Sequence, residues 1–426
     1  MLLPDTKNKD MKRNLLKQMC AEWRANIWMA IEILLVSVVL FVLADKIYTA
    51  VATINEPLGF NSEHCYLLDV KEVSEAAPDY VEYPDRRAKT EDLMTLINRL
   101  RERPEISAAA LSINAYPYNF SNSNEPIDID TFNMAESPLL RRTVEPEFLK
   151  VFRIEGANGE TSEKLGEILE RDRVIVSDNA LYRRYGMKTL KPLFGSQMVL
   201  SGNDTLELHT TFRPMRYSDY STGYGWNGGS MFTLLRPTQY TYANELSVRV
   251  LDNMDVDFAE NLMKDADGAL RVGNWYIASV QPFDFIKENF NRNAASEMRN
   301  TIVCALFLLL NIFLGILGTF WFRTQQSTKE IALRMVSGAT RSDIFRRIIG
   351  EGLILLLVVT PLAVIIDYIL TRYELTTWYD GYFEPVHFCV SVLVAWGLMA
   401  VMIVIGVYFP ARRAMAISPA AALKTD

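Results

Sequence analysis

The sequence predicts an α-helical membrane protein with four transmembrane helices and an α+β domain inserted between the first and second helices. Half of the 426 residues are hydrophobic, yet the mean hydropathy is only +0.05, which indicates apolar blocks beside an ordinary polar domain. Four stretches reach the roughly 20 apolar residues that a helix needs to cross a bilayer. They begin at Ile27, Thr301, Gly352 and Val386.

The first apolar stretch, residues 27–44, is predicted to be a retained membrane anchor. A cleaved signal peptide is the alternative, because the stretch lies near the N-terminus. However, the stretch is long for the apolar core of a signal peptide, and no small-x-small motif follows at residues 45–48. The preceding segment, residues 9–23, places apolar residues at helical spacing among lysines and arginines. This pattern favours an amphipathic helix in the inner membrane interface over a solvated basic tail.

The distribution of Lys and Arg predicts the orientation in the membrane. Lys and Arg are concentrated before the first crossing, between the second and third crossings, and in the C-terminal tail. Because such segments stay in the cytoplasm, both termini are predicted to be cytoplasmic and residues 48–299 to be exported. This exported region has 38 acidic and 27 basic residues, a net charge of −11. Such a charge argues against nucleic acid as a partner.

The predicted organisation alternates membrane and soluble segments. Its parts are a cytoplasmic amphipathic helix (1–26), transmembrane helix 1 (27–47), an extracytoplasmic α+β core domain with a helical stalk (48–300), transmembrane helix 2 (301–323), cytoplasmic helices (324–350), transmembrane helix 3 (351–371), a short extracytoplasmic loop (372–385), transmembrane helix 4 (386–409) and a cytoplasmic tail (410–426).

Within the exported region, apolar periodicity and breaker residues predict short helices and strands. A helix with Thr90 as a possible cap precedes a strand, as in a βαβ unit. Residues 283–300 contain no Pro or Gly and are predicted to continue as a helical stalk into the second crossing, with a connecting loop as the alternative. The remaining expectations are helices at 90–103, 178–185 and 258–269, strands at 106–113, 173–177, 245–251 and 275–280, and loops at 117–140 and 215–230.

The polar segment between the second and third crossings, residues 325–351, is predicted to form two short helices. Gly338 is expected to end the first helix, and Thr340 or Ser342 to cap the next one. Some apolar residues of this segment are expected to form a surface for a partner, and others are expected to continue that surface toward the membrane. They are Ile331, Leu333, Met335, Val336, Ile344, Phe345 and Ile348.

Two sequence motifs resemble those of the MacB/FtsX-type permeases of ABC transporters. KEIALRMVSGATRSDIFRRIIGEGLILL (329–356) resembles the family's cytoplasmic signature, and PARRAMAISPAAAL (410–423) is similar to its C-terminal pattern. VEPEFLKVF (144–152) and RVIVSDNALYRRYG (173–186) look like parts of the family's extracytoplasmic core. The first crossing departs from the family, because EILLV (32–36) stands where MacB has a Gly-rich pattern.

The resemblance implies a permease that works as a homo- or heterodimer with cytoplasmic ABC ATPases in the bacterial inner membrane. ATP and Mg²⁺ would bind to the ATPase, with no cofactor in this chain, and ATP hydrolysis would move the periplasmic domain to export or extract cargo. A periplasmic adaptor or outer-membrane channel is a further expected partner. The alternative is an FtsX-like regulatory scaffold that activates a periplasmic enzyme. The residues implied in ATPase coupling are Glu330, Ile331, Arg334, Gly338, Ala339, Arg341 and Asp343, and those of the C-terminal motif are Pro410, Arg412, Arg413 and Pro419.

No residue pattern in the sequence predicts catalysis or a metal site. There is no G-x-x-x-x-G-K-[ST] motif for binding nucleotide phosphates, and the three histidines are scattered. Residues 223–228 match G-x-G-x-x-G by letter, but they follow no predicted strand and are interpreted as a loop tip. The Asp128 and Asp130 carboxylates are interpreted as a solvated loop face. Cys65 is the only exported cysteine, so the domain has no internal disulfide.

Glu32 is the most notable polar residue within the predicted crossings. A carboxylate about five residues into the first crossing is costly, so it should be paired or protonated. One hypothesis is a packing or proton-sensitive contact with a partner protomer, and the alternative is a residue that reaches the lipid headgroups. Asp367, near the outer end of the third crossing, is expected to be solvated.

Overall fold

The computed structural model describes residues 23–121, 123–133, 138–200, 205–223, 228–242, 245–266, 268–326, 328–373 and 384–416. Nearly all of the expected amphipathic helix, most of the short loop before the fourth crossing, and the end of the tail lie outside these ranges. The chain divides into two compact units. We call them the helical unit (Met1–Val51, Glu297–Trp378 and Phe383–Asp426) and the α/β unit (Ala52–Ser296 with Tyr379–Tyr382).

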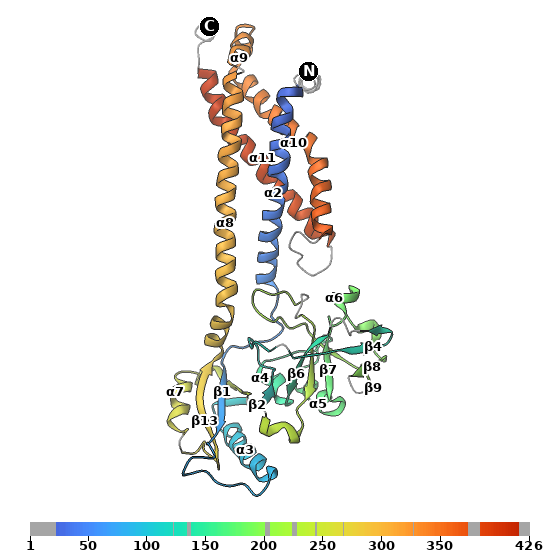
Figure 1. Ribbon diagram of the computed structural model, residues 1–426, viewed down its shortest axis with the longest axis vertical. Coiled ribbons are helices and arrows are strands. Elements are labelled where there is room, and N and C mark those ends of the chain that lie inside the picture. The colour runs from blue at the N-terminus through green and yellow to red at the C-terminus, as the bar shows by residue number, and fades with distance from the viewer. Residues whose placement is uncertain are drawn as a thin grey trace. The chain divides into compact units, whose positions relative to one another are not determined.

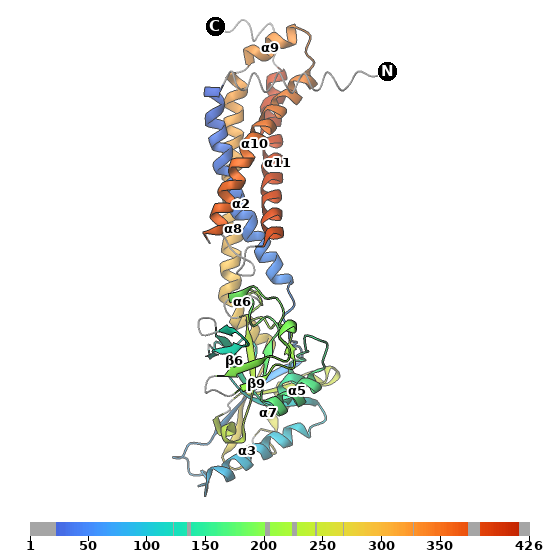
Figure 2. The same ribbon diagram turned by 90° about the vertical axis from the view of Figure 1, so that its right-hand side faces the viewer.

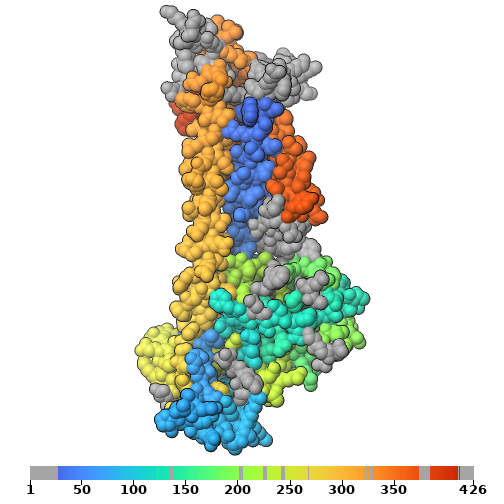
Figure 3. Space-filling view, viewed as in Figure 1, coloured from blue at the N-terminus to red at the C-terminus, as the bar shows by residue number. Residues whose placement is uncertain are grey.

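Among the residues that the structure describes, four helices are long and apolar enough to cross a membrane, in agreement with the four predicted crossings. They are α2 (Trp23–Asn55), α8 (Phe283–Gln326), α10 (Arg341–Arg372) and α11 (Pro385–Ala416). Side chains such as Phe41, Leu356 and Met399 form the core of the helical unit. Other apolar side chains are exposed, for example Phe307 and Leu314 on α8, whose outer surface is visible in Figure 3. Helices that are apolar on all sides are typical of membrane spans.

The α/β unit is built on a split βαβ arrangement. Its elements are β1 (Cys65–Glu72), α3 (Arg86–Arg101), β2 (Ile106–Ile113), β12 (Glu245–Val250), α7 (Phe258–Lys264) and β13 (Trp275–Pro282). The strand order is β2-β12-β1-β13, and each neighbouring pair is antiparallel. Strands β1 and β2 are therefore parallel to each other with β12 between them. Helices α3 and α7 pack on this part of the sheet through one apolar cluster (Figure 1, Figure 2).

The residues between β2 and β12 extend this sheet and add a second one. The extension runs β10-β7-β11-β6-β2, with β11 and β6 parallel, and the second sheet runs β5-β4-β8-β9. The elements are β3 (Asn124–Glu125), β4 (Ile127–Ile129), β5 (Phe132–Asn133), β6 (Leu139–Val144), α4 (Glu147–Val151), α5 (Ser162–Asp172), β7 (Val174–Ser177), α6 (Tyr182–Tyr185), β8 (Gln197–Leu200), β9 (Thr205–Glu207), β10 (Thr211–Phe212) and β11 (Ser230–Leu234), with 3-10 turns at Lys191–Leu193, Pro237–Tyr242 and Asp252–Met254.

Two local expectations were wrong. Thr90 does not cap α3: the helix begins at Arg86, and the Asp85 side chain accepts a hydrogen bond from the Ala88 N–H. The expected loop at 117–140 contains strands β3, β4 and β5 and the start of β6. In β4, Ile127 and Ile129 are buried on one side, a two-residue period that the surrounding Asn, Ser and Pro conceal. Asp128 therefore lies on a strand.

The residues that were predicted to form a stalk, 283–300, are helical. Helix α8 begins at Phe283, directly after β13, and continues without interruption to Gln326. Its residues up to 296 belong to the α/β unit and those from 297 to the helical unit. Of the G-x-G-x-x-G stretch, residues 224–227 lie outside the described ranges.

Candidate functional site

The polar segment after α8 folds into a helical hairpin, residues 328–351, made of α9 (Thr328–Val336), a turn and the start of α10. Gly338 has φ 93°, in the left-handed region. The N–H groups of Ser337, Gly338 and Ala339 donate to carbonyls in the last turn of α9 at 3.0, 3.1 and 3.0 Å. A Cβ on Gly338 would meet no atom within 4 Å. Glycine is therefore favoured here by backbone conformation rather than by space, and it lies at the predicted helix end.

The second helix of the hairpin begins with a capping box. The Asp343 N–H donates to Thr340 Oγ1, and the Thr340 N–H donates to Asp343 Oδ2, both at 3.2 Å. Thr340, rather than Ser342, is therefore the cap. Reciprocal bonds of this kind satisfy two backbone donors that a helix N-terminus otherwise leaves unpaired. The structure thus gives Asp343 a local role in starting α10.

Glu330 joins the two helices of the hairpin. Its Oε1 accepts hydrogen bonds from Arg334 Nε at 3.0 Å and Nη2 at 2.6 Å, one turn further along α9. The same oxygen lies 3.3 Å from Nη2 of Arg347, on α10. All three side chains are partly exposed, so each ion pair contributes little alone. Together they fix the angle between α9 and α10, with one more positive than negative charge among the three.

The apolar residues of the hairpin divide into a buried and an exposed set. Ile331 and Ile344 are 6% and 3% exposed and pack together with Met335 as neighbour. Leu333 and Val336 are 59% and 63% exposed. The expectation that Ile331 offers a docking surface is therefore wrong, because it closes the hairpin from inside. The exposed residues of the hairpin that are available to a partner include Leu333, Val336 and Arg341.

A small cavity lies behind the hairpin, lined by residues that include Met29, Phe320 and Glu330. Its volume is about 50 Å³, whereas small-molecule sites usually enclose about 300 Å³ or more. The described part of the hairpin therefore suits contact with another protein surface rather than binding of a nucleotide.

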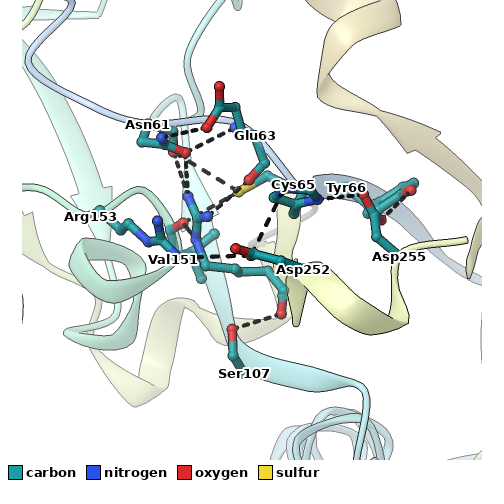
Figure 4. A network of polar contacts seen from close by, with 11 residues as sticks. Asn61, Glu63, Cys65, Tyr66, Ser107, Val151, Arg153, Asp252 and Asp255 are labelled. Atoms are coloured by element: carbon teal, nitrogen blue, oxygen red, sulfur yellow. Dashed lines mark hydrogen bonds and ion pairs between the residues drawn. The ribbon is translucent and has the colours of Figure 1, made fainter.

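In the α/β unit, buried Arg249 holds the segment that follows α2. Its guanidinium is bonded to backbone oxygens of Asn61, Glu63 and Val151, which are labelled in Figure 4. Nε donates to the Val151 carbonyl at 2.6 Å, Nη1 to the Glu63 carbonyl at 2.9 Å, and Nη2 to the Asn61 carbonyl at 2.7 Å. Burial lowers the pKa of Arg249 from its usual value. A buried charge with well-placed acceptors is costly to disturb.

The thiol of Cys65 belongs to the same network. Its Sγ donates to the Val151 carbonyl at 3.3 Å, and the side chain is buried. Burial raises the pKa of the thiol to about 12, so it is unreactive at neutral pH. Close by, Asp255 accepts a hydrogen bond from Tyr66 at 2.7 Å and lies 2.6 Å from His64 Nδ1 (Figure 4).

A second buried arginine, Arg216, holds the end of α2 itself. Nη1 donates to the Glu56 carbonyl at 2.5 Å, and Nε to the Ser221 carbonyl at 2.9 Å. The Arg216 N–H also donates to the Leu58 carbonyl at 3.0 Å. The Glu56 carboxylate in turn accepts from the Gly223 N–H at 3.2 Å. The segment 214–223, defined here as the clamp segment, therefore holds the residues that directly follow α2.

The clamp segment also holds the first turns of α8, through Asp219. Its Oδ1 accepts from the Tyr118 hydroxyl at 2.9 Å, and its Oδ2 accepts from Asn291 at 3.1 Å and lies 3.2 Å from Lys287 Nζ. Phe283, the first residue of α8, is 1% exposed in the core of the unit. Both membrane-directed connections, from α2 and to α8, are thus fixed to one short segment of the α/β unit.

Comparison with known proteins connects these features to a family. Residues 302–419 match the family described as FtsX-like permease C-terminal. The chain is also similar to the macrolide export ATP-binding/permease protein MacB of Escherichia coli, at 25% identity over 183 residues, or 42% of this chain and 28% of that protein. For MacB of Shewanella sp. (strain W3-18-1) the identity is 24% over 189 residues, or 43% and 28%.

The chain is therefore similar to the MacB/FtsX-like ABC permeases. The matched region spans just over a quarter of the length of these curated relatives. With its four apolar helices, the protein is a multi-pass membrane protein. The FtsX-like region contains α9, α10 and α11, and thus the whole hairpin. Pro410 is buried inside α11 and Arg412 is exposed, whereas the Arg413 side chain and Pro419 lie outside the described residues.

Glu32 has a partner within its own chain. The Thr319 hydroxyl of α8 lies 3.0 and 2.9 Å from the two carboxylate oxygens. The same hydroxyl lies 3.1 Å from the Gly315 carbonyl. A Cβ on Gly315 would lie 3.8 Å from Glu32. Glu32 therefore takes part in the packing of α2 on α8, a contact that neither hypothesis from the sequence named.

The sequence did not predict one buried polar pair in the helical unit, Asp45 and His387. It also gave the wrong burial for Asp367. Asp45 of α2 lies 2.9 Å from His387 of α11, and both are nearly inaccessible. The His387 ring also stacks on Tyr48, with 4.5 Å between ring centroids. Asp367 was expected to be solvated but is only 4% exposed. A signal was available, because ionisable residues inside membrane helices usually face protein.

Proposed function

We propose that this chain is the permease subunit of an ABC transporter of the mechanotransmission type. A separate cytoplasmic ATPase, which holds ATP and Mg²⁺, would dock on the hairpin, and its nucleotide cycle would move the α/β unit to export or extract cargo. We further propose that the α/β unit lies in the periplasm, that both termini lie in the cytoplasm and that the four long apolar helices lie in the bacterial inner membrane.

The continuous helix α8 carries this proposal. Its first residue is buried in the core of the α/β unit, and Asp219 fixes its third turn. Its last residue, Gln326, lies two positions before α9. A helix rises about 1.5 Å per residue, so 44 residues span about 66 Å. Movement of the hairpin would therefore reach the α/β unit through unbroken backbone hydrogen bonds.

The names of the relatives support a coupling to ATP. Each is described as an ATP-binding and permease protein. We propose that the ATP-binding part is supplied here by a partner subunit, that two permease protomers assemble with it, and that a periplasmic adaptor or outer-membrane channel completes the assembly. Macrolides are named as cargo only for the relatives.

Cysteine cross-linking tests the docking surface. We expect Leu333→Cys and Val336→Cys, both exposed, to cross-link in membranes to a subunit that hydrolyses ATP. Ile331→Cys is the matched control, because this residue lies on the same helix but faces inward. Absence of an ATP-hydrolysing subunit from the Leu333 and Val336 products would overturn the proposal. Recovery of a periplasmic hydrolase together with the ATPase would instead support the regulatory scaffold.

A change in the turn of the hairpin tests the coupling itself. We expect Gly338→Pro to uncouple ATP hydrolysis from cargo handling while the protein remains in the membrane, because proline cannot adopt the left-handed φ of this position. ATP hydrolysis and cargo export are measured in reconstituted vesicles. Gly350→Ala, in a helical position with open space around the new Cβ, is the control. Normal cargo handling by Gly338→Pro would contradict the proposal.

A further inference from the structure

A cleft on the α/β unit has the composition of a binding site for a small organic anion. It has a volume of about 440 Å³, within the usual range for ligand sites. Strands β6, β7 and β11 of the large sheet and strands β8 and β9 of the second sheet contribute its lining residues. It lies near the carboxyl ends of the parallel strands β6 and β11, a place where ligands often bind in sheets with parallel strands.

Positive charge dominates this cleft. Its lining contains Arg141, Arg173 and Arg236, but only one carboxylate, that of Glu125. Glu125 is 2.9 Å from Arg141 and is neutralised by it. Among the residues that the structure describes, neither Arg173 nor Arg236 has an acceptor for its guanidinium. Both arginines are exposed, so the cleft presents two positive charges without a protein counter-charge in a region with a net charge of −11.

Two threonines at the base of the cleft leave a hydrogen-bond donor unused. Thr143 and Thr233 lie opposite each other on β6 and β11, with their hydroxyl oxygens 2.9 Å apart. Two hydroxyls carry two protons, and one bond between them uses only one. Thr143 is 5% exposed. The remaining proton is therefore available to an acceptor in the cleft, and an oxyanion is the acceptor that the nearby arginines would attract.

Besides the polar Thr205 and Gln239, the lining includes apolar side chains. Val174, Leu206 and Leu234 contribute to it, so the cleft can shield a hydrocarbon portion next to the charged group. Inorganic anions would leave this part of the surface unused, and uncharged apolar molecules would leave the arginines without a counter-charge.

We propose that this cleft binds a small amphiphilic anion, whose phosphate or carboxylate head contacts Arg173, Arg236 and the Thr143–Thr233 pair and whose short apolar part lies on Val174, Leu206 and Leu234. The site is independent of the docking of an ATPase on the hairpin. If the anion site proved wrong, the proposed docking of an ATPase would be unaffected, and the reverse also holds, so the two proposals can be tested separately.

Calorimetric titration of the full chain in nanodiscs tests the site. The probe is hexyl phosphate, with inorganic phosphate and hexyl glucoside as the head-only and tail-only comparisons, and with empty nanodiscs as the blank. We expect hexyl phosphate to bind more tightly than either comparison and to weaken with added salt. Equal binding of hexyl glucoside, equal binding of inorganic phosphate, or no binding of hexyl phosphate beyond that of empty nanodiscs would overturn the proposal.

Variants locate the binding. We expect the double change Arg173→Gln and Arg236→Gln to weaken hexyl phosphate binding about tenfold or more, because two charge-assisted hydrogen bonds are lost. The matched control, Arg87→Gln with Arg213→Gln, removes two exposed arginines of the same unit that do not line the cleft. Thr143→Val with Thr233→Val keeps the shape and should weaken binding several-fold. An unchanged affinity in the arginine variant, with unfolding curves like those of the wild type, would overturn the assignment.

Discussion

The hairpin that follows α8 and the α/β unit in which α8 begins are held together by different kinds of contact. We call the hairpin the docking end and the α/β unit, with its contacts to α8 and to the segment after α2, the anchored end. In the hairpin, the capping box joins residues three positions apart and Glu330 reaches Arg347 seventeen positions along the chain. In the α/β unit, Asp219 contacts Asn291, 72 positions away, and Arg249 contacts Asn61, 188 positions away. Local contacts allow a segment to rearrange alone, whereas contacts between distant segments require a larger cooperative unit to open. One end can adapt to a partner, and the other is fixed.

This difference suits a helix that transmits movement from one end to the other. The proposed docking end has exposed apolar residues and partly exposed ion pairs, each of which costs little to break. The anchored end has buried guanidiniums on backbone carbonyls, which cost much more to separate. A nucleotide-driven change would therefore alter the hairpin first and transmit movement through α8 without loosening its attachment. The predictions below test this contrast, from the largest expected effect to the smallest.

Cys65 reports how tightly the anchored end is closed. Its pKa is raised by burial from 9.0 to about 12, so below pH 9 the folded protein should contain about a thousandfold less thiolate than the unfolded chain. We expect iodoacetamide to label Cys65 at least that much more slowly in the native full chain than in denaturant, as measured by mass spectrometry. The unfolded state ionises first as pH rises, so stability should fall from about pH 9 toward pH 12. Equal labelling rates would show that the anchor opens readily.

Removing Arg249 should release the anchored end. We expect Arg249→Leu to lower the free energy of unfolding by about 3 kcal/mol or more, because the buried Val151 carbonyl keeps only the weak thiol donor of Cys65 and the part-buried Glu63 and Asn61 carbonyls lose their guanidinium donors. Arg249→Lys, which keeps the charge but not the three-directional geometry, should be intermediate. Denaturant unfolding of the detergent-solubilised chain measures both. Arg87→Leu, with an exposed one-turn ion pair, is the control and should change little.

Asp219→Asn should weaken the hold of the clamp segment on α8. The carboxylate has three partners, and the amide keeps the shape but loses the charge and one acceptor. We expect a loss of about 1–3 kcal/mol and faster hydrogen exchange in residues 283–291, with the hairpin unchanged. Asp172→Asn, at the end of α5, serves as the comparison, because its carboxylate pairs with the adjacent Arg171 and not with α8. Faster exchange in the hairpin instead would contradict the independence of the two ends.

Much of the hairpin could be predicted from the sequence, because its determinants lie within a few residues of one another. Gly338 and Thr340 mark the boundary by local backbone chemistry. The anchored end could not be predicted, since no pattern relates Arg216 to Glu56 or Arg249 to Asn61 before the sheet brings them together. Ile331 was misassigned for a related reason: periodicity identifies an apolar residue but not whether α10 or a partner covers it. Its role in ATPase coupling, like that of the other hairpin residues, stays a prediction.

The smallest predicted effect tests whether backbone conformation or the space around the side chain favours glycine in the hairpin. Gly338 and Gly350 both have open space around a built Cβ, but only Gly338 has a positive φ. Gly338→Ala should therefore destabilise the turn by about 1 kcal/mol, and Gly350→Ala, inside α10, should stabilise its helix by up to about 1 kcal/mol. Hydrogen exchange of peptides covering 328–351 measures both changes against the wild type. Because the contacts of the hairpin are local, neither change should affect exchange at Asn61 or Arg249; an effect there would mean that the docking end and the anchored end are one cooperative unit.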